Sequence, residues 1–174
     1  MVPRNTADLT FYVLTQEHAE HVFAPLCDND LYTFIPDTVP DSVEKLQERY
    51  TFLQAGSKNL GEVWYNWILF SEVHDAYVGL FQSTVRVGGE TEISYFVFKK
   101  FWGNQYGTKA GRQVVKFLFE KYQINSIFAY IDSRNTYSQR VVENLGFIQT
   151  REIKNADHFK GCVSHEYVYE KRRK

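Results

Sequence analysis

Apolar and polar positions along the chain follow two different periods, which together predict a mixed α/β fold. Runs rich in β-branched and aromatic residues predict strands at Leu9 to Thr15, Val63 to Ser71, Ala76 to Val85, Thr91 to Phe98, Ser126 to Ile131, Phe147 to Ile153 and Val163 to Glu170. Helices are expected at Gln16 to Ala24, Asp41 to about Ala55, Asn104 to Tyr122 and Asn135 to Leu145. The order is β-α-α-β-β-β-α-β-α-β-β, a mixed sheet with an antiparallel N-terminal half and one central helical crossover.

Helix-breaking and capping residues set the expected boundaries. Pro25 is expected to stop the first helix, and the prolines within Asp28 to Pro40 predict an irregular segment. Asp41-Ser42-Val43-Glu44 supplies an N-cap signal for the second helix, and Gly56 suits the position just after its C-terminus. A turn is expected within Asp157 to Gly161, between the last two strands.

Composition narrows the class of protein. The 174 residues are 44% hydrophobic, 24% charged and 17% aromatic, which predicts one globular domain over residues 1–174. A formal charge of −1 argues against nucleic-acid binding by bulk electrostatics. Cys27 and Cys162 form no disulfide framework, and no apolar run is long enough for a membrane span or a signal peptide. We therefore expect a cytoplasmic protein with neither a membrane nor a nucleic-acid partner.

The stretch Glu90 to Ala110 carries the most informative chemistry. A strand, a loop and a helix start follow one another, and the first amides of a helix have no partners within it. Together with the helix dipole, these amides predict an anion site suited to a phosphate or pyrophosphate. Gly103 and Gly107 would allow the backbone to approach such an anion closely, because no Cβ stands in the way. Gly107 and Gly111, one helical turn apart, would let the helix pack closely against the sheet. The alternative is that these glycines serve turn geometry and packing alone.

Two motifs at their mutual spacing favour a specific family. The first reads Glu92-Ile93-Ser94-Tyr95 and then Trp102-Gly103-Asn104-Gln105-Tyr106-Gly107-Thr108-Lys109-Ala110. The second comprises Asn135, Ser138, Val141, Glu143, Leu145, Gly146 and Phe147. From about Leu9 to Glu170, the chain resembles the GCN5-related N-acetyltransferase (GNAT) superfamily, in the branch of ribosomal-protein N-terminal acetyltransferases such as RimJ and RimL.

The resemblance implies both a fold and an activity. The fold is a mostly antiparallel sheet of six to seven strands, splayed between strands 4 and 5 and flanked by about four helices. The activity is transfer of an acetyl group from acetyl-CoA, as cosubstrate and without a metal, to a primary amine on a protein N-terminus or a small molecule. The alternative is a catalytically idle CoA-binding or protein-interaction module on the same fold.

The resemblance also implies which residues bind acetyl-CoA. The pyrophosphate would lie on the amides of the loop and helix start, and the pantetheine arm would pair with the end of the fourth strand. The expected binding residues are Phe96, Val97, Phe98, Gly103, Asn104, Gln105, Tyr106, Gly107, Thr108, Lys109 and Asn135. The Val97 amide is the first candidate for polarising the thioester carbonyl. Gln105 occupies the family's first glycine, a position whose conformation costs a glutamine free energy. Asn135 would bond the cofactor or cap its own helix.

Two residues are candidates for proton transfer. Glu92 would remove the proton of the amine, directly or through water; alternatively it pairs with a neighbouring strand. Ser138 would protonate the departing thiolate, as the resemblance implies; alternatively its hydroxyl bonds the backbone of its own helix.

The acceptor amine is less well defined by the sequence. The segment Asp28 to Pro40, the two N-terminal helices and the turn Asp157 to Cys162 are expected to line its cleft. Tyr32, Phe34, Asp37 and Phe159 would give it an aromatic, mildly acidic mouth. A protein N-terminus, a peptide lysine, a polyamine or an aminoglycoside would each fit. The five histidines form no metal-ligand set. The protein is expected to be a monomer or a homodimer. In a dimer, the two C-terminal strands, rich in Tyr167, Val168 and Tyr169, would supply the contact.

Overall fold

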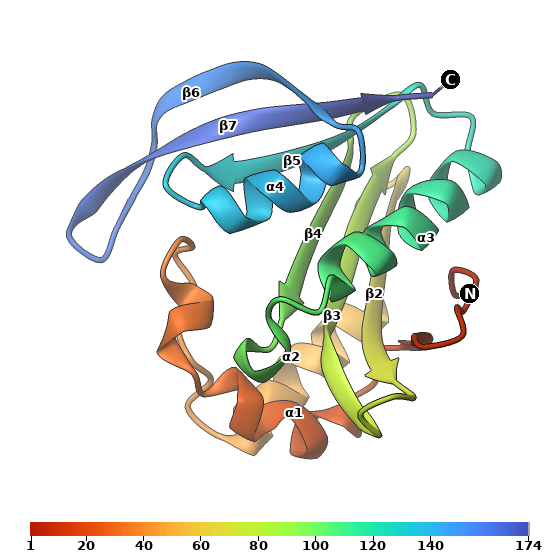
Figure 1. Ribbon diagram of the computed structural model, residues 1–174, viewed down its shortest axis with the longest axis vertical. Coiled ribbons are helices and arrows are strands. Elements are labelled where there is room, and N and C mark those ends of the chain that lie inside the picture. The colour runs from red at the N-terminus through yellow and green to blue at the C-terminus, as the bar shows by residue number, and fades with distance from the viewer. Residues whose placement is uncertain (174) are drawn as a thin grey trace.

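The computed structural model describes residues 1–173 and forms a seven-stranded sheet in the order β1-β2-β3-β4-β5-β7-β6 (Figure 1). The strands are β1 (Thr10–Val13), β2 (Glu62–Ser71), β3 (Ala76–Arg86), β4 (Thr91–Val97), β5 (Ser126–Asp132), β6 (Ile148–Phe159) and β7 (Cys162–Arg172). The helices are α1 (His18–Leu26), α2 (Val43–Ala55), α3 (Tyr106–Lys121) and α4 (Thr136–Asn144), with 3-10 turns at Asn29–Tyr32 and Lys99–Phe101.

The β4–β5 pair is parallel, and every other neighbouring pair in this sheet is antiparallel. The parallel pair requires a crossover, which α3 supplies. In Figure 1, α3 and α4 cover one face of the sheet, and α1 and α2 lie toward the other. The expected mixed α/β fold is therefore confirmed.

The central strands β2 and β3 have consecutive buried residues, and since strand side chains alternate between the two faces, both faces are buried there. Trp67 on β2 and Phe81 on β3 are at most 1% exposed, as are Val22 of α1 and Leu118 of α3. The aromatic-rich composition thus fills a core on each side of the sheet.

The local signals set some boundaries correctly and others not. Ser42 caps α2 by accepting a hydrogen bond from the Lys45 amide, and Gly56 ends the helix at a φ of 77°, as expected. Pro25 does not stop α1, because the Cys27 amide still reaches the carbonyls of Phe23 and Ala24, and a proline in the last turn sacrifices only one helical bond.

The C-terminal hairpin differs most from expectation. β6 continues six residues past the expected end at Ile153, and its register shifts between Ile153 and Asp157. A bulge absorbs the extra residues, with Asn155 at a φ of 52°. β7 lies between β5 and β6, so its backbone is paired on both edges. Of the two C-terminal strands expected to supply a dimer contact, β7 therefore has no free edge, whereas β6 lies at the edge of the sheet.

Two glycines are required by close approach. The sequence predicts that Gly111 packs α3 against the sheet. In the structure, a Cβ on Gly111 would lie 2.5 Å from the Leu145 side chain, so this glycine packs α3 against the segment after α4 instead. A Cβ on Gly79 would lie 2.1 Å from the carbonyl oxygen of Phe96, so only glycine lets β4 lie this close to β3.

Candidate active site

The site is centred where β4 and β5 part. The two strands pair only at Thr91 with Ile127 and at Glu92 with Phe128, and beyond these positions they diverge (Figure 1). The Phe98 amide donates to the Val78 carbonyl at 2.9 Å, toward β3. Because successive amides of a strand point to opposite edges, the Val97 amide faces the gap toward β5. This is the position expected for a donor to a thioester carbonyl.

The N-terminus of α3 borders the same gap. The first helical bond runs from the Lys109 amide to the Gln105 carbonyl at 2.9 Å. Within residues 1–173, the amides of Gln105, Tyr106, Gly107 and Thr108 donate to no protein acceptor. These donors and the helix dipole make a site for an anion such as a pyrophosphate.

Gln105 adopts the conformation expected of a glycine at its position. Its φ and ψ are 63° and 16°, in the left-handed region, and its side chain makes no capping bond. Gly103, two residues earlier, has a φ of 81°. The loop therefore keeps the backbone path of a glycine-rich phosphate loop, at a cost of about 1–2 kcal/mol for a residue with a Cβ.

Trp102 contacts the candidate pantetheine strand. Its indole N–H donates to the Val97 carbonyl at 2.6 Å, although the side chain is half exposed. The carbonyl of Val97 faces the same gap as its amide. The sequence singled out Trp102 only as part of a motif, and nothing in its spacing predicted this bond.

Glu92 is paired with a neighbouring strand, which is the second of the two expected possibilities. Its Oε1 accepts a hydrogen bond from Arg86, whose Nε also donates to Glu62 at 2.9 Å. The guanidinium thus neutralises the carboxylate and occupies one of its oxygens.

Glu166 is a second carboxylate on the same face of the sheet, and no sequence signal indicated it. It lies opposite Asp132 of β5 and Ile153 of β6, and its side chain is half-buried. Burial raises the pKa of Glu166, and the nearby carboxylates of Asp157, Asp132 and Glu92 raise it further. The pairing of β4 with β5, of β5 with β7 and of β7 with β6 brings these acids together.

Asn135 and Ser138 lie at the start of α4. The Asn135 side chain accepts from the Ser138 amide at 3.1 Å, so it caps the helix, one of its two expected roles. The Ser138 hydroxyl has no partner in the described part of the chain, whereas its carbonyl accepts from the Tyr95 hydroxyl at 3.1 Å. Burial raises the pKa of Tyr95, which keeps this hydroxyl a donor.

Lys109 is paired with the N-terminal segment. Its ammonium pairs with Asp8 of the N-terminal segment, and this contact lowers the pKa of Asp8. Binding of a CoA phosphate by Lys109 would require that pair to open.

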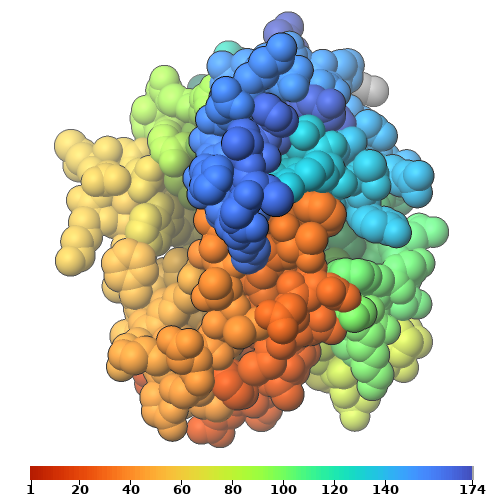
Figure 2. Space-filling view, turned by 90° about the vertical axis from the view of Figure 1, so that its left-hand side faces the viewer, coloured from red at the N-terminus to blue at the C-terminus, as the bar shows by residue number. Residues whose placement is uncertain are grey.

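The two walls of the expected acceptor cleft are joined by Lys160. Its ammonium donates to the carbonyls of Ile35 at 2.9 Å and Asp37 at 3.0 Å, and also to that of Tyr32. Figure 2 shows the tip of the β6–β7 hairpin, in blue, lying against this orange segment. Phe159 lies beside Arg134 and Lys160 at the hairpin tip.

Residues 8–148 match the model of the acetyltransferase (GNAT) domain family. The chain belongs to the GNAT acetyltransferase family. Its GNAT domain is 27% identical over 84 residues to YdaF of Bacillus subtilis, which carries the name of a ribosomal N-acetyltransferase, and 33% identical over 63 residues to YkkB of the same organism. The matched stretches span 45% and 37% of those relatives, less than half of either.

Solved structures share the GNAT fold over nearly the whole chain. A GNAT-family acetyltransferase from Bacillus anthracis superposes with a TM-score of 0.84 at 20% identity, covering 99% of this chain and 98% of that one. RimL, a ribosomal L7/L12 α-N-protein acetyltransferase solved with coenzyme A, gives a TM-score of 0.87 at 12% identity over 99% and 98% of the chains. At these identities the likeness establishes the fold.

The donor set of the GNAT site fits an acyl-CoA. Unpaired amides at α3 suit a pyrophosphate, and the open edge of β4 suits the amide groups of a pantetheine arm. Over residues 1–173, no helix is long and apolar enough to cross a membrane. The same residues contain no group of three or more His, Cys, Asp or Glu side chains arranged to hold a metal ion.

Proposed function

We propose that this protein is an N-acetyltransferase that uses acetyl-CoA to acetylate a primary amine on a protein N-terminus or a small molecule. The observation that carries the proposal is the convergence of two sets of backbone donors on one gap. The Val97 amide faces it from β4, and the free amides of α3 border it. A thioester and a pyrophosphate need donors at these two places.

Each group of the site has a defined part in acyl transfer. Bound acetyl-CoA supplies the acetyl thioester. The Val97 amide would donate a hydrogen bond to the carbonyl oxygen as negative charge develops on it. The Ser138 hydroxyl, which has no other partner among residues 1–173, would give a proton to the departing sulfur.

The amine must lose a proton, and two carboxylates could accept it. Glu92 is neutralised by Arg86, whereas Glu166 has no salt-bridge partner in the described part of the chain, and burial and nearby carboxylates raise its pKa. We therefore assign the base to Glu166, acting directly or through water, and keep Glu92 as the alternative.

A catalytically idle CoA-binding module is the second candidate. Three features favour it. They are the left-handed backbone conformation of Gln105, the Glu92–Arg86 ion pair and the hydrogen bond from the Trp102 indole to the Val97 carbonyl. The indole would have to leave the Val97 carbonyl before a pantetheine amide could pair with it, and the Glu92–Arg86 pair would have to open if Glu92 were the base.

Calorimetric titration with acetyl-CoA, followed by a thiol-release assay with primary amines, separates the candidates. A transferase binds acetyl-CoA with a micromolar Kd, about −8 kcal/mol, and releases CoA when an amine is added. Binding without release under any amine would favour the idle module. Absence of binding would contradict both candidates.

A further inference from the structure

The indole of Trp102 lies on a backbone group that a pantetheine arm needs. Its N–H donates to the Val97 carbonyl at 2.6 Å. This carbonyl faces the gap between β4 and β5, because the next amide, that of Phe98, donates to Val78 on the β3 side. An arm that extends β4 as a further strand would lie about 4.8 Å from it and donate to the same oxygen. The indole ring and the arm therefore compete for one edge of β4.

A tight turn brings Trp102 back to Val97, five residues earlier. The Phe101 amide donates to the Phe98 carbonyl at 2.8 Å, and the Trp102 amide donates to the Lys99 carbonyl at 3.1 Å. These backbone bonds hold the turn without help from the indole. The side chain of Trp102 can therefore rotate away from Val97 while the turn keeps its shape.

The indole is also held more loosely than its neighbour in the turn. Phe101 is buried and packs against His74 and Tyr106. The Trp102 side chain is 47% exposed, and its ring pairs with no other aromatic ring in the described part of the chain. One neutral hydrogen bond stabilises such a contact only modestly, so a bound arm can displace it.

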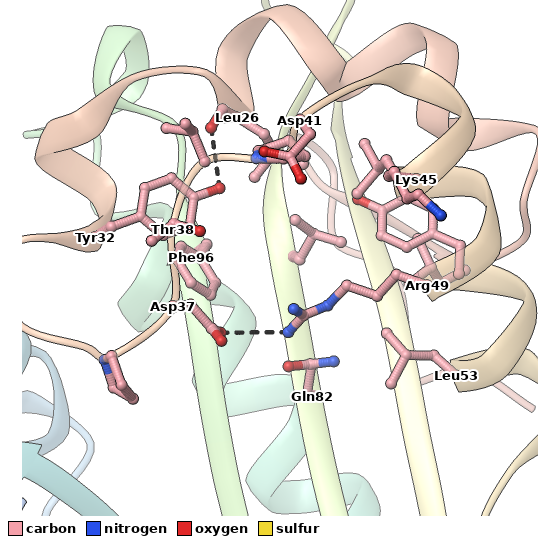
Figure 3. A pocket seen from close by; sticks show the side chains of 17 residues that line it. Leu26, Tyr32, Asp37, Thr38, Asp41, Lys45, Arg49, Leu53, Gln82 and Phe96 are labelled. Carbon is pink, nitrogen blue, oxygen red and sulfur yellow. Dashed lines mark hydrogen bonds and ion pairs between the residues drawn. The ribbon is translucent and has the colours of Figure 1, made fainter. Parts of the chain in front are cut away.

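The acceptor side of β4 is already open. A cavity of about 400 Å³ lies there, between α2 and the strands β3 and β4. Figure 3 shows Phe96 of β4 at this cavity, with Arg49 of α2 reaching across it to Asp37. The volume falls within the range of small-molecule sites, about 300–1,000 Å³. The obstacle to binding two substrates at β4 therefore lies on the pantetheine side.

We infer that the hydrogen bond from Trp102 to Val97 is an autoinhibitory latch, which closes the pantetheine edge of β4 until the indole swings away. The inference rests on the proposed acyl-CoA site and adds a conformational step to it. Only the unlatched fraction of the molecules binds the arm, so the apparent affinity for acetyl-CoA is reduced by that fraction. The nucleotide half of CoA, which the α3 amides would hold, does not need this edge and is not affected.

Calorimetric titration with two ligands tests the latch. Acetyl-CoA carries the pantetheine arm, whereas 3′-phospho-ADP is the nucleotide half of CoA and retains the pyrophosphate. Trp102→Phe keeps an aromatic ring and loses the N–H, so we expect it to bind acetyl-CoA about three- to tenfold more tightly than wild type. Its affinity for 3′-phospho-ADP should not change.

A second indole provides the matched control. The N–H of Trp64 donates to Glu62 at 2.9 Å, on β2 and away from the edge of β4 that faces β5. Trp64→Phe should therefore change neither affinity. Trp102→Leu also lacks the donor and should tighten acetyl-CoA binding, and it serves if Trp102→Phe does not fold.

A spectroscopic measurement follows the latch in the wild-type protein. The chain has three tryptophans, so its ¹H–¹⁵N spectrum should contain three indole N–H signals, and the one that Trp102→Phe or Trp102→Leu lacks belongs to Trp102. The hydrogen bond to Val97 should place this signal downfield of an indole in water. Acetyl-CoA should move it upfield, whereas 3′-phospho-ADP should leave it downfield.

The outcomes separate this inference from the proposed function. If the Trp102 variants bind acetyl-CoA no more tightly than wild type, the latch is overturned and the acyl-CoA site stands. Equal tightening of both ligands would also overturn the latch, because the gain would then lie at the α3 amides. If acetyl-CoA binds to none of these proteins, the proposed acyl-CoA site itself fails, and the latch fails with it.

Discussion

The hydroxyl of Tyr95 on β4 donates to the carbonyl of Ser138 on α4 at 3.1 Å. This bond joins the strand that carries the Val97 amide to the helix that carries the candidate proton donor. The Tyr95 ring also lies against α3, since a Cβ on Gly107 would be 3.5 Å from it. One partly buried side chain thus contacts the three elements that border the gap.

Tyr95→Phe should lower the free energy of unfolding by about 1 kcal/mol, because the variant loses one largely buried hydrogen bond. It should also reduce kcat more than acetyl-CoA affinity, since Ser138 loses its anchor to β4. Urea denaturation and thiol release measure the two effects. Tyr137→Phe, at a residue 73% exposed on the same helix, is the matched control and should change neither. Equal behaviour of the two variants would show that the bond does not position Ser138.

Glu166→Gln should reduce kcat/KM at pH 7 by about 100-fold, the lower end of the contribution of a general base. The fall of kcat/KM toward acidic pH should be absent in this variant, because protonation of Glu166, whose pKa is raised, causes that fall in the wild type. Glu92→Gln should reduce kcat/KM by less than tenfold, since Arg86 already neutralises that carboxylate. Glu152→Gln on the exposed face of β6 is the control. The reverse ranking would assign the base to Glu92.

Asp132→Asn should lower the free energy of unfolding at pH 7 by about 2 kcal/mol. Burial opposes ionisation of Asp132, but hydrogen bonds from Arg134 and Ser164 outweigh it and hold the pKa at about 2, below the ordinary value of 3.8. A lowered pKa contributes stability that is complete above pH 4 and is lost as the pH falls toward 2. The difference between variant and wild type should therefore shrink over that interval.

Urea denaturation at several pH values measures this dependence. Asp75→Asn, in the exposed turn between β2 and β3, provides the control and should show no such trend. A difference between Asp132→Asn and wild type that is constant with pH would mean that the loss comes from packing and not from the charge.

Gln105→Gly should raise the free energy of unfolding by about 0.5–1 kcal/mol, because glycine adopts a φ of 63° without steric cost. The same change should tighten acetyl-CoA binding, since no side chain then stands beside the phosphate-binding amides. Gln105→Ala retains a Cβ, and we expect neither a higher free energy of unfolding nor tighter acetyl-CoA binding from it. Urea denaturation and calorimetry compare the three proteins. Equal gains for Ala and Gly would place the cost in the glutamine side chain and not in the backbone.

The sequence by itself determined what depends on neighbours along the chain. The two hydrophobic periods specify seven strands and four helices in the correct order, and Ser42 and Gly56 bound α2 through contacts within a few residues. The conformational cost at Gln105 was likewise predicted from its place in the family motif, which requires a glycine there.

Only the tertiary structure decided what depends on pairing between distant segments. β7 lies between β5 and β6, which leaves β6 and not β7 at the edge of the sheet and puts Glu166 opposite Asp132. Arg86 reaches Glu92 across a turn, and Tyr50 of α2 meets the strands β3 and β4 around one cavity. Strand order and register set these contacts. Neither has a local signature, because a strand's side-chain pattern tells which face is buried and not which strand lies beside it.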